Sequence, residues 1–326
     1  MSGMKRREFI TLLGGAAITL PLTVRAQQGA MPLVGLLSGA DPVGYAPQLE
    51  GFRLGLRDHG FVEGQTIRIE YRWAESKYDR LPALAADLVG RKVDIIITQG
   101  TPAALAAKRA TSTIPIVMAV VGNPVETGIV ASIARPGGNI TGSSVFYDEI
   151  NAKRVELLKD MIPSLAHVGV LLNPDNPAND SVMHTAIRAA KLLNVFLQPM
   201  NVRRSEEFEA VFEREAPQIG ALLVVDDGLA IANPGRIAQL AIKNRLPSIG
   251  FREYCQAGGL AAYGVDFPHI WRNAGAFVDK ILKGRRPADL PIEQATRFEF
   301  MINLKTAKTL SFDVPPAISA LATAIE

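Results

Sequence analysis

Cysteine is almost absent from this sequence, since Cys255 is the only one among 326 residues. A lone thiol cannot close an internal disulfide, so the folded chain must be stabilised by a hydrophobic core. No cysteine follows the apolar segment near the N-terminus, which excludes attachment of a lipid there after processing. We interpret Cys255 as a packed thiol rather than a nucleophile.

Sequence patterns for catalysis are also missing. There is no Gly-x-Ser-x-Gly nucleophile elbow, no Gly-x-x-x-x-Gly-Lys-Ser/Thr phosphate loop and no Gly-x-Gly-x-x-Gly fingerprint after the first predicted strand. The histidines are scattered without ligand spacing to one another or to the cysteine: His59, His167, His184 and His269. We therefore expect no catalytic residues, no metal site and no cofactor.

An excess of charge of either sign is missing once residues 1–26 are set aside. The whole chain has 35 basic and 32 acidic residues. Residues 1–26 hold four of the basic residues and one of the acidic ones, which leaves 31 of each. A neutral protein has no general electrostatic attraction for nucleic acid or for an anionic membrane, so neither is an expected partner.

Long hydrophobic runs are confined to residues 9–22. This stretch is interrupted by Gly14, Gly15 and Pro21 and is too short to span about 30 Å of hydrocarbon as a helix. No membrane insertion of the mature chain is expected.

We interpret residues 1–26 as an export signal. A basic start that contains Arg6-Arg7 precedes the apolar run, and the small residues Val24 and Ala26 predict cleavage after Ala26. The paired arginines favour the twin-arginine route, with general secretory export as the alternative. An exported protein without an anchor is retained only behind an outer barrier, so we expect a periplasmic location.

Short runs rich in Val and Ile alternate with amphipathic segments, which is typical of parallel strands joined by helices and predicts an α/β fold. In the first half, strands are predicted at residues 33–37, 66–73, 93–98, 114–120 and 140–144, and helices at 47–59, 80–89, 102–110 and 126–133. In the second half, strands are predicted at 168–172, 195–201, 221–225, 248–251 and 260–264, and helices at 149–161, 178–193, 206–215 and 230–244. A tail follows with a helix at 270–283, a strand at 297–302 and a helix at 304–310 capped by Asn303.

About 300 mature residues exceed one typical core, so two doubly wound parallel-sheet lobes with a cleft between them are expected. The tail is surplus to two simple halves. If the chain returns to the first lobe near Gly264 and crosses again near Thr296, three segments form a multi-strand hinge. The predicted N-terminal lobe comprises residues 31–142 plus 266–296, and the C-terminal lobe comprises 143–265 plus 297–326.

Ligands of doubly wound sheets bind beyond the carboxyl ends of the strands, where helix N-termini attract anions. Gly100-Thr101-Pro102 has the clearest mechanism: Gly100 lets a ligand approach the backbone, Thr101 offers an N-cap hydroxyl, and Pro102 occupies the first helical position. A carboxylate could dock there, or Thr101 could simply cap its own helix. The other candidates at strand ends and at the domain junction are Ser38, Asn123, Tyr147, Asn173 and Asp227, and ordinary turn or packing roles are open for them too.

Several motifs spread over the mature chain resemble one family. They are Gly51-Phe52-Arg53-x-Gly55-Leu56-Arg57-x-x-Gly60, Pro136-Gly137-Gly138-Asn139-Ile140-Thr141-Gly142, Asn173-Pro174-x-Asn176-Pro177, Ala257-Gly258-Gly259-Leu260, Tyr263-Gly264-x-Asp266 and Ile302-Asn303-Leu304-Lys305-Thr306-Ala307. Together with the N-terminal segment they look like the ABC-transporter substrate-binding family, whose characterised members include carriers of tryptophan and other aromatic amino acids.

The resemblance implies a type I periplasmic-binding-protein fold that captures a small ligand in its cleft and passes it to an inner-membrane permease with its ATPase. It adds weight to Gly100, Thr101, Asn123, Tyr147 and the other cleft candidates. The loop after the fourth strand often has Asp before Pro in this family, whereas this chain has Asn123. A neutral amide weakens the case for an α-amino acid and leaves room for a carboxylate or aromatic acid, although Asp227 or Asp266 could bind an ammonium group.

Two alternative hypotheses are a periplasmic enzyme on a two-lobed scaffold and a ligand-sensing subunit for a receptor kinase. An enzyme would need a catalytic base with a partner, for which Asp41, Asp227 and Asp266 are the candidates. We expect a monomer.

Overall fold

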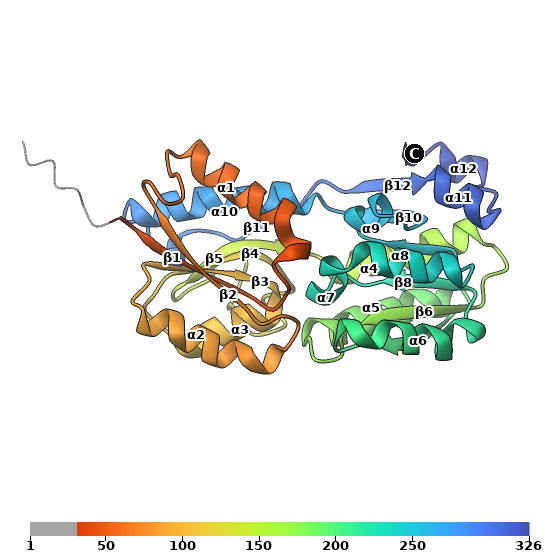
Figure 1. Cartoon of the computed structure of the whole chain (residues 1–326), viewed down its shortest axis with the longest axis horizontal. Helices are drawn as coiled ribbons and strands as arrows, with labels where there is room; N and C mark the ends of the chain where they lie inside the picture. The colour runs from red at the N-terminus through yellow and green to blue at the C-terminus, as the bar shows by residue number, and fades with distance from the viewer. Residues whose placement is uncertain (1–30, 326) are drawn as a thin grey trace, which may run out of the picture. The chain divides into compact units, whose positions relative to one another are not determined.

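The computed structural model describes residues 31–325 (Figure 1). The predicted signal peptide and its cleavage after Ala26 lie outside these residues. Within the described range, no helix combines the length and the apolar character that crossing a membrane requires.

The first lobe is built on a parallel sheet whose central strands are buried on both faces. Its strand order is β11 (Glu293–Gln294), β5 (Ile140–Val145), β4 (Ile116–Gly122), β3 (Ile95–Gln99), β1 (Leu33–Ser38) and β2 (Arg68–Trp73). Every neighbouring pair in this sheet is parallel. All residues of β3 and β4 are buried, as the continuous apolar runs predict for strands covered by helices on both sides.

Helices cover both faces of this sheet. In Figure 1, α1 (Ala46–Asp58) and α10 (Phe267–Leu282) lie side by side above it, and α2 (Leu81–Gly90) and α3 (Gly100–Ala110) lie below. The two upper helices approach closely because glycines face their contact: a Cβ on Gly55 would lie 2.0 Å from the carbonyl oxygen of Arg272. Gly51 and Gly55 of the predicted motif thus serve helix packing, whereas Gly60 follows α1 with φ +84°.

The second lobe repeats this arrangement. Its sheet has the order β13 (Thr323–Ile325), β12 (Glu299–Asn303), β10 (Ala261–Gly264), β9 (Ser248–Gly250), β8 (Ala221–Val224), β6 (His167–Leu172) and β7 (Phe196–Asn201). The order of β7, β6, β8, β9 and β10 matches that of β2, β1, β3, β4 and β5, so both sheets are doubly wound. Only β12, which lies antiparallel to β10, departs from the parallel pattern within the described strands.

The helices of the second lobe and of the tail are α4 (Tyr147–Met161), α5 (Ala178–Leu192), α6 (Phe208–Glu215), α7 (Gly228–Ala232), α8 (Pro234–Lys243), α9 (Arg252–Gln256), α11 (Leu304–Leu310) and α12 (Pro316–Ser319). The 3-10 turns η1 (Val43–Tyr45) and η2 (Tyr78–Arg80) belong to the first lobe. The predicted cap at Asn303 is confirmed, because its side-chain oxygen accepts a hydrogen bond from the backbone N–H of Thr306.

The chain crosses between the lobes three times, which confirms the multi-strand hinge. The crossings follow β5, β10 and β11, and after each one the chain enters α4, α10 or β12. The exact lobe boundaries stay a prediction. The first sheet continues to Val145, so the chain leaves it a few residues after position 142.

Two predicted helices differ from the structure. Residues 126–128 belong to a hydrogen-bonded turn, with Thr127 N–H donating to Asn123 C=O, and residues 129–133 are irregular. Gly128 adopts a left-handed conformation (φ +69°), which does not continue a helix. The helix predicted at 230–244 is divided into α7 and α8 at Asn233, since the Pro234 that follows has no N–H to continue the helix.

Candidate functional site

The carboxyl ends of the two sheets meet at a small cavity lined by both lobes. The first lobe contributes Gly39, Tyr78, Gln99, Gly100, Thr101 and Pro102, and the second contributes Tyr147, Asn176, Ala178, Asp226, Gly228 and Ile231. The cavity measures about 20 Å³, which is room for about one water molecule. The lobes therefore close tightly on each other at this point.

A buried hydrogen-bonded chain fixes the first-lobe side. Ser38, at the end of β1, donates its hydroxyl proton to Gln99 Oε1 over 2.9 Å, and Gln99 Nε2 donates to the hydroxyl oxygen of Tyr45 over 2.8 Å. Ser38 is fully buried and is separated from the cavity by Gln99. It therefore orients Gln99, whose side chain lines the cavity.

The N-terminus of α3 forms the neighbouring wall. Gly100 has φ +77°, a left-handed conformation that favours glycine, and α3 begins at this residue. The expectation that Thr101 caps α3 is wrong: Gln99 is the N-cap residue, and the Thr101 hydroxyl donates to the carbonyl oxygen of Gly122 over 3.3 Å. Pro102 accordingly lies beyond the first helical position. The first N–H groups of α3, which have no partner within a helix, begin at the cavity.

Asp227 is the central acidic group on the second-lobe side. Its carboxylate accepts hydrogen bonds from the Tyr78 hydroxyl at 3.1 Å, from Asn176 Nδ2 at 2.8 Å and from Leu229 N–H at 3.0 Å. Tyr78 belongs to the first lobe, so this hydrogen bond joins the lobes. All three donors are neutral, and no ion pair within residues 31–325 involves Asp227.

Burial dominates the electrostatics of this contact. It raises the pKa of Asp227, while the hydrogen bonds from Asn176, Leu229 and Tyr78 act in the opposite direction. Burial, together with the charge of Asp227, also holds the pKa of Tyr78 well above its usual value. The Tyr78 hydroxyl therefore keeps its proton and acts as a donor.

The preceding residue, Asp226, is neutralised within its own lobe. Its carboxylate pairs with the fully buried guanidinium of Arg154, which also donates to the carbonyl oxygens of Tyr263 and Val224. The pair holds α4 against the carboxyl ends of β8 and β10. Of the two adjacent aspartates, only Asp227 has no cation beside it in the described part of the chain.

Of the remaining candidates, only Tyr147 lines the cavity. Tyr147 begins α4 and lines the cavity, and its ring packs where a Cβ on Gly122 would otherwise lie. Asn173 is buried behind the cavity, where its Oδ1 accepts from the N–H of Asp175. Asn123 lies outside the cavity, with its amide close to Glu126 and Ser181. The geometry therefore gives Asn123 no direct part in setting the charge of a ligand in this cavity.

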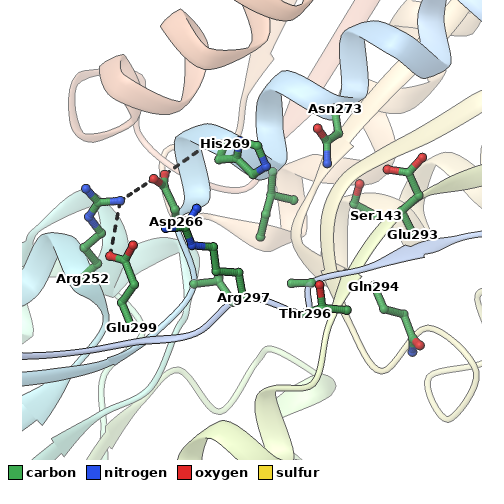
Figure 2. A pocket seen from close by; sticks show the side chains of 13 residues that line it. Ser143, Arg252, Asp266, His269, Asn273, Glu293, Gln294, Thr296, Arg297 and Glu299 are labelled. Carbon is green, nitrogen blue, oxygen red and sulfur yellow. Dashed lines mark hydrogen bonds and ion pairs between the residues drawn. The ribbon is translucent and has the colours of Figure 1, made fainter. Parts of the chain in front are cut away.

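Asp266 is separated from the other candidates and lines a cavity of about 310 Å³ at the hinge. Figure 2 shows Arg252 bound to both Asp266 and Glu299, while Ser143, Asn273 and Glu293 lie at the other end of this cavity. Asp266 also caps α10 by accepting from His269 N–H at 3.1 Å. Its carboxylate is thus already used for an ion pair and a helix cap.

Nine of the twelve residues that line the cavity were not among the predicted site residues, including Gln99, Asn176 and Tyr78. Gln99 directly precedes the predicted site residue Gly100, and Asn176 lies in the same Asn-Pro-Asp-Asn loop as the predicted site residue Asn173. Tyr78 lies in a short 3-10 turn after β2 with no motif around it. Only the fold brings Tyr78 to Asp227, which is 149 positions away.

Cys255 is fully buried, and burial raises the pKa of its thiol to about 12, so it is a packed thiol as predicted. Among residues 31–325, no group of three or more His, Cys, Asp or Glu side chains is arranged to hold a metal ion.

Comparison with known proteins identifies the family. The ABC transporter substrate binding protein family matches residues 43–326. A tyrosine-binding protein of Clostridioides difficile is 30% identical over 262 residues, which are 80% of this chain and 75% of that protein. A crystal structure of a conserved domain protein from Vibrio cholerae has a TM-score of 0.85 at 25% identity over 91% of this chain and 100% of the other. A Streptococcus pneumonia ABC domain in complex with L-Trp has a TM-score of 0.81 at 22% identity over 90% and 100% of the two chains. The two-lobed fold is that of type I periplasmic binding proteins, and the chain belongs to the family of ABC transporter substrate-binding proteins.

Proposed function

We propose that this protein is the periplasmic solute-binding component of an ABC importer and that it binds an aromatic amino acid between its lobes. It delivers this ligand to an inner-membrane permease that works with an ATPase. We further propose that the mature protein is a monomer exported with cleavage after Ala26. The tyrosine-binding relative and the L-Trp complex of the structural neighbour support an aromatic amino acid over the broader range of carboxylates.

The surroundings of Asp227 are the main support for an amino acid as the ligand. The Asp227 carboxylate has no cationic partner in the described chain. It lies just behind Tyr78 and Asn176, which line the cavity together with the N-terminus of α3. A carboxylate favours an ammonium group, and a helix N-terminus favours a carboxylate, so the two walls complement the two charges of an amino acid. Tyr147 and Tyr78 offer aromatic surface beside them.

Ligand entry requires the lobes to separate. The cavity of about 20 Å³ is too small for an aromatic side chain, and the Tyr78 hydroxyl occupies the carboxylate that an ammonium group would use. In our proposal the ligand enters an open form, replaces Tyr78 at Asp227 and favours renewed closure through contacts with both lobes.

Calorimetric titration of the mature protein with matched ligands tests this function. L-Tyrosine should bind more tightly than tyramine, which lacks the carboxylate, and more tightly than 3-(4-hydroxyphenyl)propionate, which lacks the ammonium group. L-Tryptophan and L-phenylalanine complete the panel. Equal affinity for the propionate would exclude a role for Asp227 in ammonium binding and favour an aromatic acid as the ligand.

Replacement of Asp227 by Asn should weaken binding of the tightest amino acid at least about thirtyfold, because removing one member of a buried charge pair costs about 2–5 kcal/mol. The Asp175→Asn variant is a matched control, since Asp175 lies on the same edge of the sheet but is half exposed and pairs with Arg203. If Asp227→Asn retains wild-type affinity, the ammonium group binds elsewhere.

Wild-type affinity should also fall as the pH is lowered through the raised pKa of Asp227, because the protonated carboxyl cannot pair with an ammonium group.

A further inference from the structure

A second cavity at the lobe interface, distinct from the hinge cavity lined by Asp266, lies beside the cleft. It measures about 170 Å³, and its walls include Asn123, Val125, Glu126, Phe146, Asp148 and Glu149. The first three belong to the loop after β4 in the first lobe, and the last three lie at the start of α4. Tyr147 lines the cleft cavity, whereas its neighbours Phe146 and Asp148 line this one.

The walls of this second cavity combine apolar surface with negative charge. Val125 is 43% exposed and Phe146 is 38% exposed, so both offer apolar surface to a ligand. Glu126, Asp148 and Glu149 supply three carboxylates, and no basic residue of the described chain lines the cavity. Such a surface favours a cation that carries an apolar portion.

Asp148 is buried without full hydrogen bonding. Only 7% of this residue is exposed, and within residues 31–325 its Oδ1 atom has no hydrogen-bond partner. A buried carboxylate oxygen without a donor is costly, so such an atom at a cavity wall indicates a missing partner. Asp148 Oδ1 therefore points to a donor that the protein itself does not provide.

The other Asp148 oxygen shares its hydrogen-bond donor with a second carboxylate. Its Oδ2 lies within hydrogen-bond distance of the Ser181 hydroxyl, and the same hydroxyl lies 2.6 Å from Glu126 Oε2. A hydroxyl has one proton and can donate to only one carboxylate at a time. The second carboxylate needs a proton or a nearby cation to remain so close.

The groups around Asp148 do not supply that cation. Burial raises the pKa of Asp148 most, and the charge of Glu126 acts in the same direction. The hydrogen bond from Ser181, the nearby amide of Asn123 and the charge of Arg188 lower the pKa. Arg188 donates its hydrogen bond to Thr185 on its own helix, and among the described residues it forms no ion pair with Asp148.

We propose that this second cavity binds a small organic amine in its ammonium form. The ammonium group donates to Asp148 Oδ1 and is neutralised by Asp148 and Glu126, while the alkyl portion packs against Val125 and Phe146. Residues of both lobes surround the amine, so its binding favours the closed arrangement. It should therefore strengthen binding of a cleft ligand, and by linkage the cleft ligand strengthens amine binding by the same factor.

The test uses n-butylamine, titrated calorimetrically into the mature protein at neutral pH. It should bind with one molecule per chain and at least tenfold more tightly than 1-butanol or butyrate, which have similar size but no positive charge. Asp148→Asn and Glu126→Gln should each weaken the binding of n-butylamine at least tenfold. Glu126 is exposed and in a loop, so its variant is expected to fold even if Asp148→Asn does not. Asp160→Asn, on the exposed side of α4, is the matched control and should bind like the wild type.

Three results would overturn the proposal. The first is unchanged n-butylamine affinity in both Glu126→Gln and Asp148→Asn. The second is loss of n-butylamine binding in Asp227→Asn, which would locate the amine in the cleft. The third is that sodium chloride displaces n-butylamine as effectively as a second alkylammonium salt does, which would indicate non-specific attraction of cations. Failure of the amino acid titration with retained n-butylamine binding would contradict the proposed function and leave this second site standing.

Discussion

Replacement of Arg154 by Met should lower the free energy of unfolding by about 3–5 kcal/mol, the usual cost of removing one partner from a buried ion pair. The guanidinium is fully buried and the Asp226 side chain is 1% exposed, so bulk solvent cannot compensate the charge left on Asp226. Arg154 also donates to the backbone carbonyls of Val224 and Tyr263, which would lose their donor as well. Urea denaturation of wild type and variant measures this loss.

Two further variants isolate the cause. Arg154→Met combined with Asp226→Leu should recover part of the stability, because the unpaired buried carboxylate is removed together with its partner. Arg236→Ala is the control for loss of an arginine in a surface ion pair with Glu209, and it should change stability by no more than about 1 kcal/mol. A double variant as unstable as Arg154→Met would show that the lost carbonyl hydrogen bonds, and not the charge of Asp226, dominate.

A single methyl group on Gly44 should prevent the lobes from closing and weaken ligand binding at least about tenfold, or about 1.4 kcal/mol. A Cβ on Gly44 would lie 2.3 Å from Ala232 Cα, far inside the usual contact distance of about 3.5–4.0 Å. Gly44 belongs to η1 of the first lobe and Ala232 ends α7 of the second, so the collision is between backbones of different lobes. Separation of the lobes relieves it, whereas a side-chain rotation cannot.

Calorimetry with the tightest amino acid of the ligand panel measures the affinity of Gly44→Ala, and small-angle scattering measures its closure. The variant should contract less than wild type at saturating ligand, with little change in the unfolding midpoint without ligand, because each lobe keeps its own sheet. Gly235→Ala is the matched control, since no atom lies closer than 4.0 Å to a Cβ at that position. Wild-type affinity in Gly44→Ala would mean that ligand binding does not need the η1–α7 contact.

The sequence predicted the architecture because its signals are local. Continuous apolar strands such as Ile95–Gln99 and the helices between them are visible as periodic patterns, and parallel strands joined by helices can form few topologies. The helix predicted at 126–133 was wrong for an equally local reason. Its apolar spacing was compatible with a helix, but Gly128 adopts a left-handed conformation that ends the turn there, and this outweighed the pattern.

The candidate site was predicted less completely. The rule that ligands bind at the carboxyl ends of parallel strands led to Gly100, Thr101 and Asp227, which do lie at or beside the cleft cavity. The same rule also led to Asn123, which lies beside a second cavity, and the family pattern led to Asp266, which caps a helix at the hinge. The rule identifies the edge of a sheet, and it does not tell which side chains turn towards the same space.

The sequence by itself determined the family, the two doubly wound sheets and the three crossings between them, because strand patterns, family motifs and a surplus tail are properties of consecutive residues. The tertiary structure alone decided that Tyr78 meets Asp227, that Arg154 neutralises Asp226 and that Gly44 touches Ala232. These partners are far apart along the chain, and their contact depends on how two lobes and a hinge pack. The lack of a cationic partner for Asp227, on which the proposed ligand class rests, is therefore a property of the folded protein.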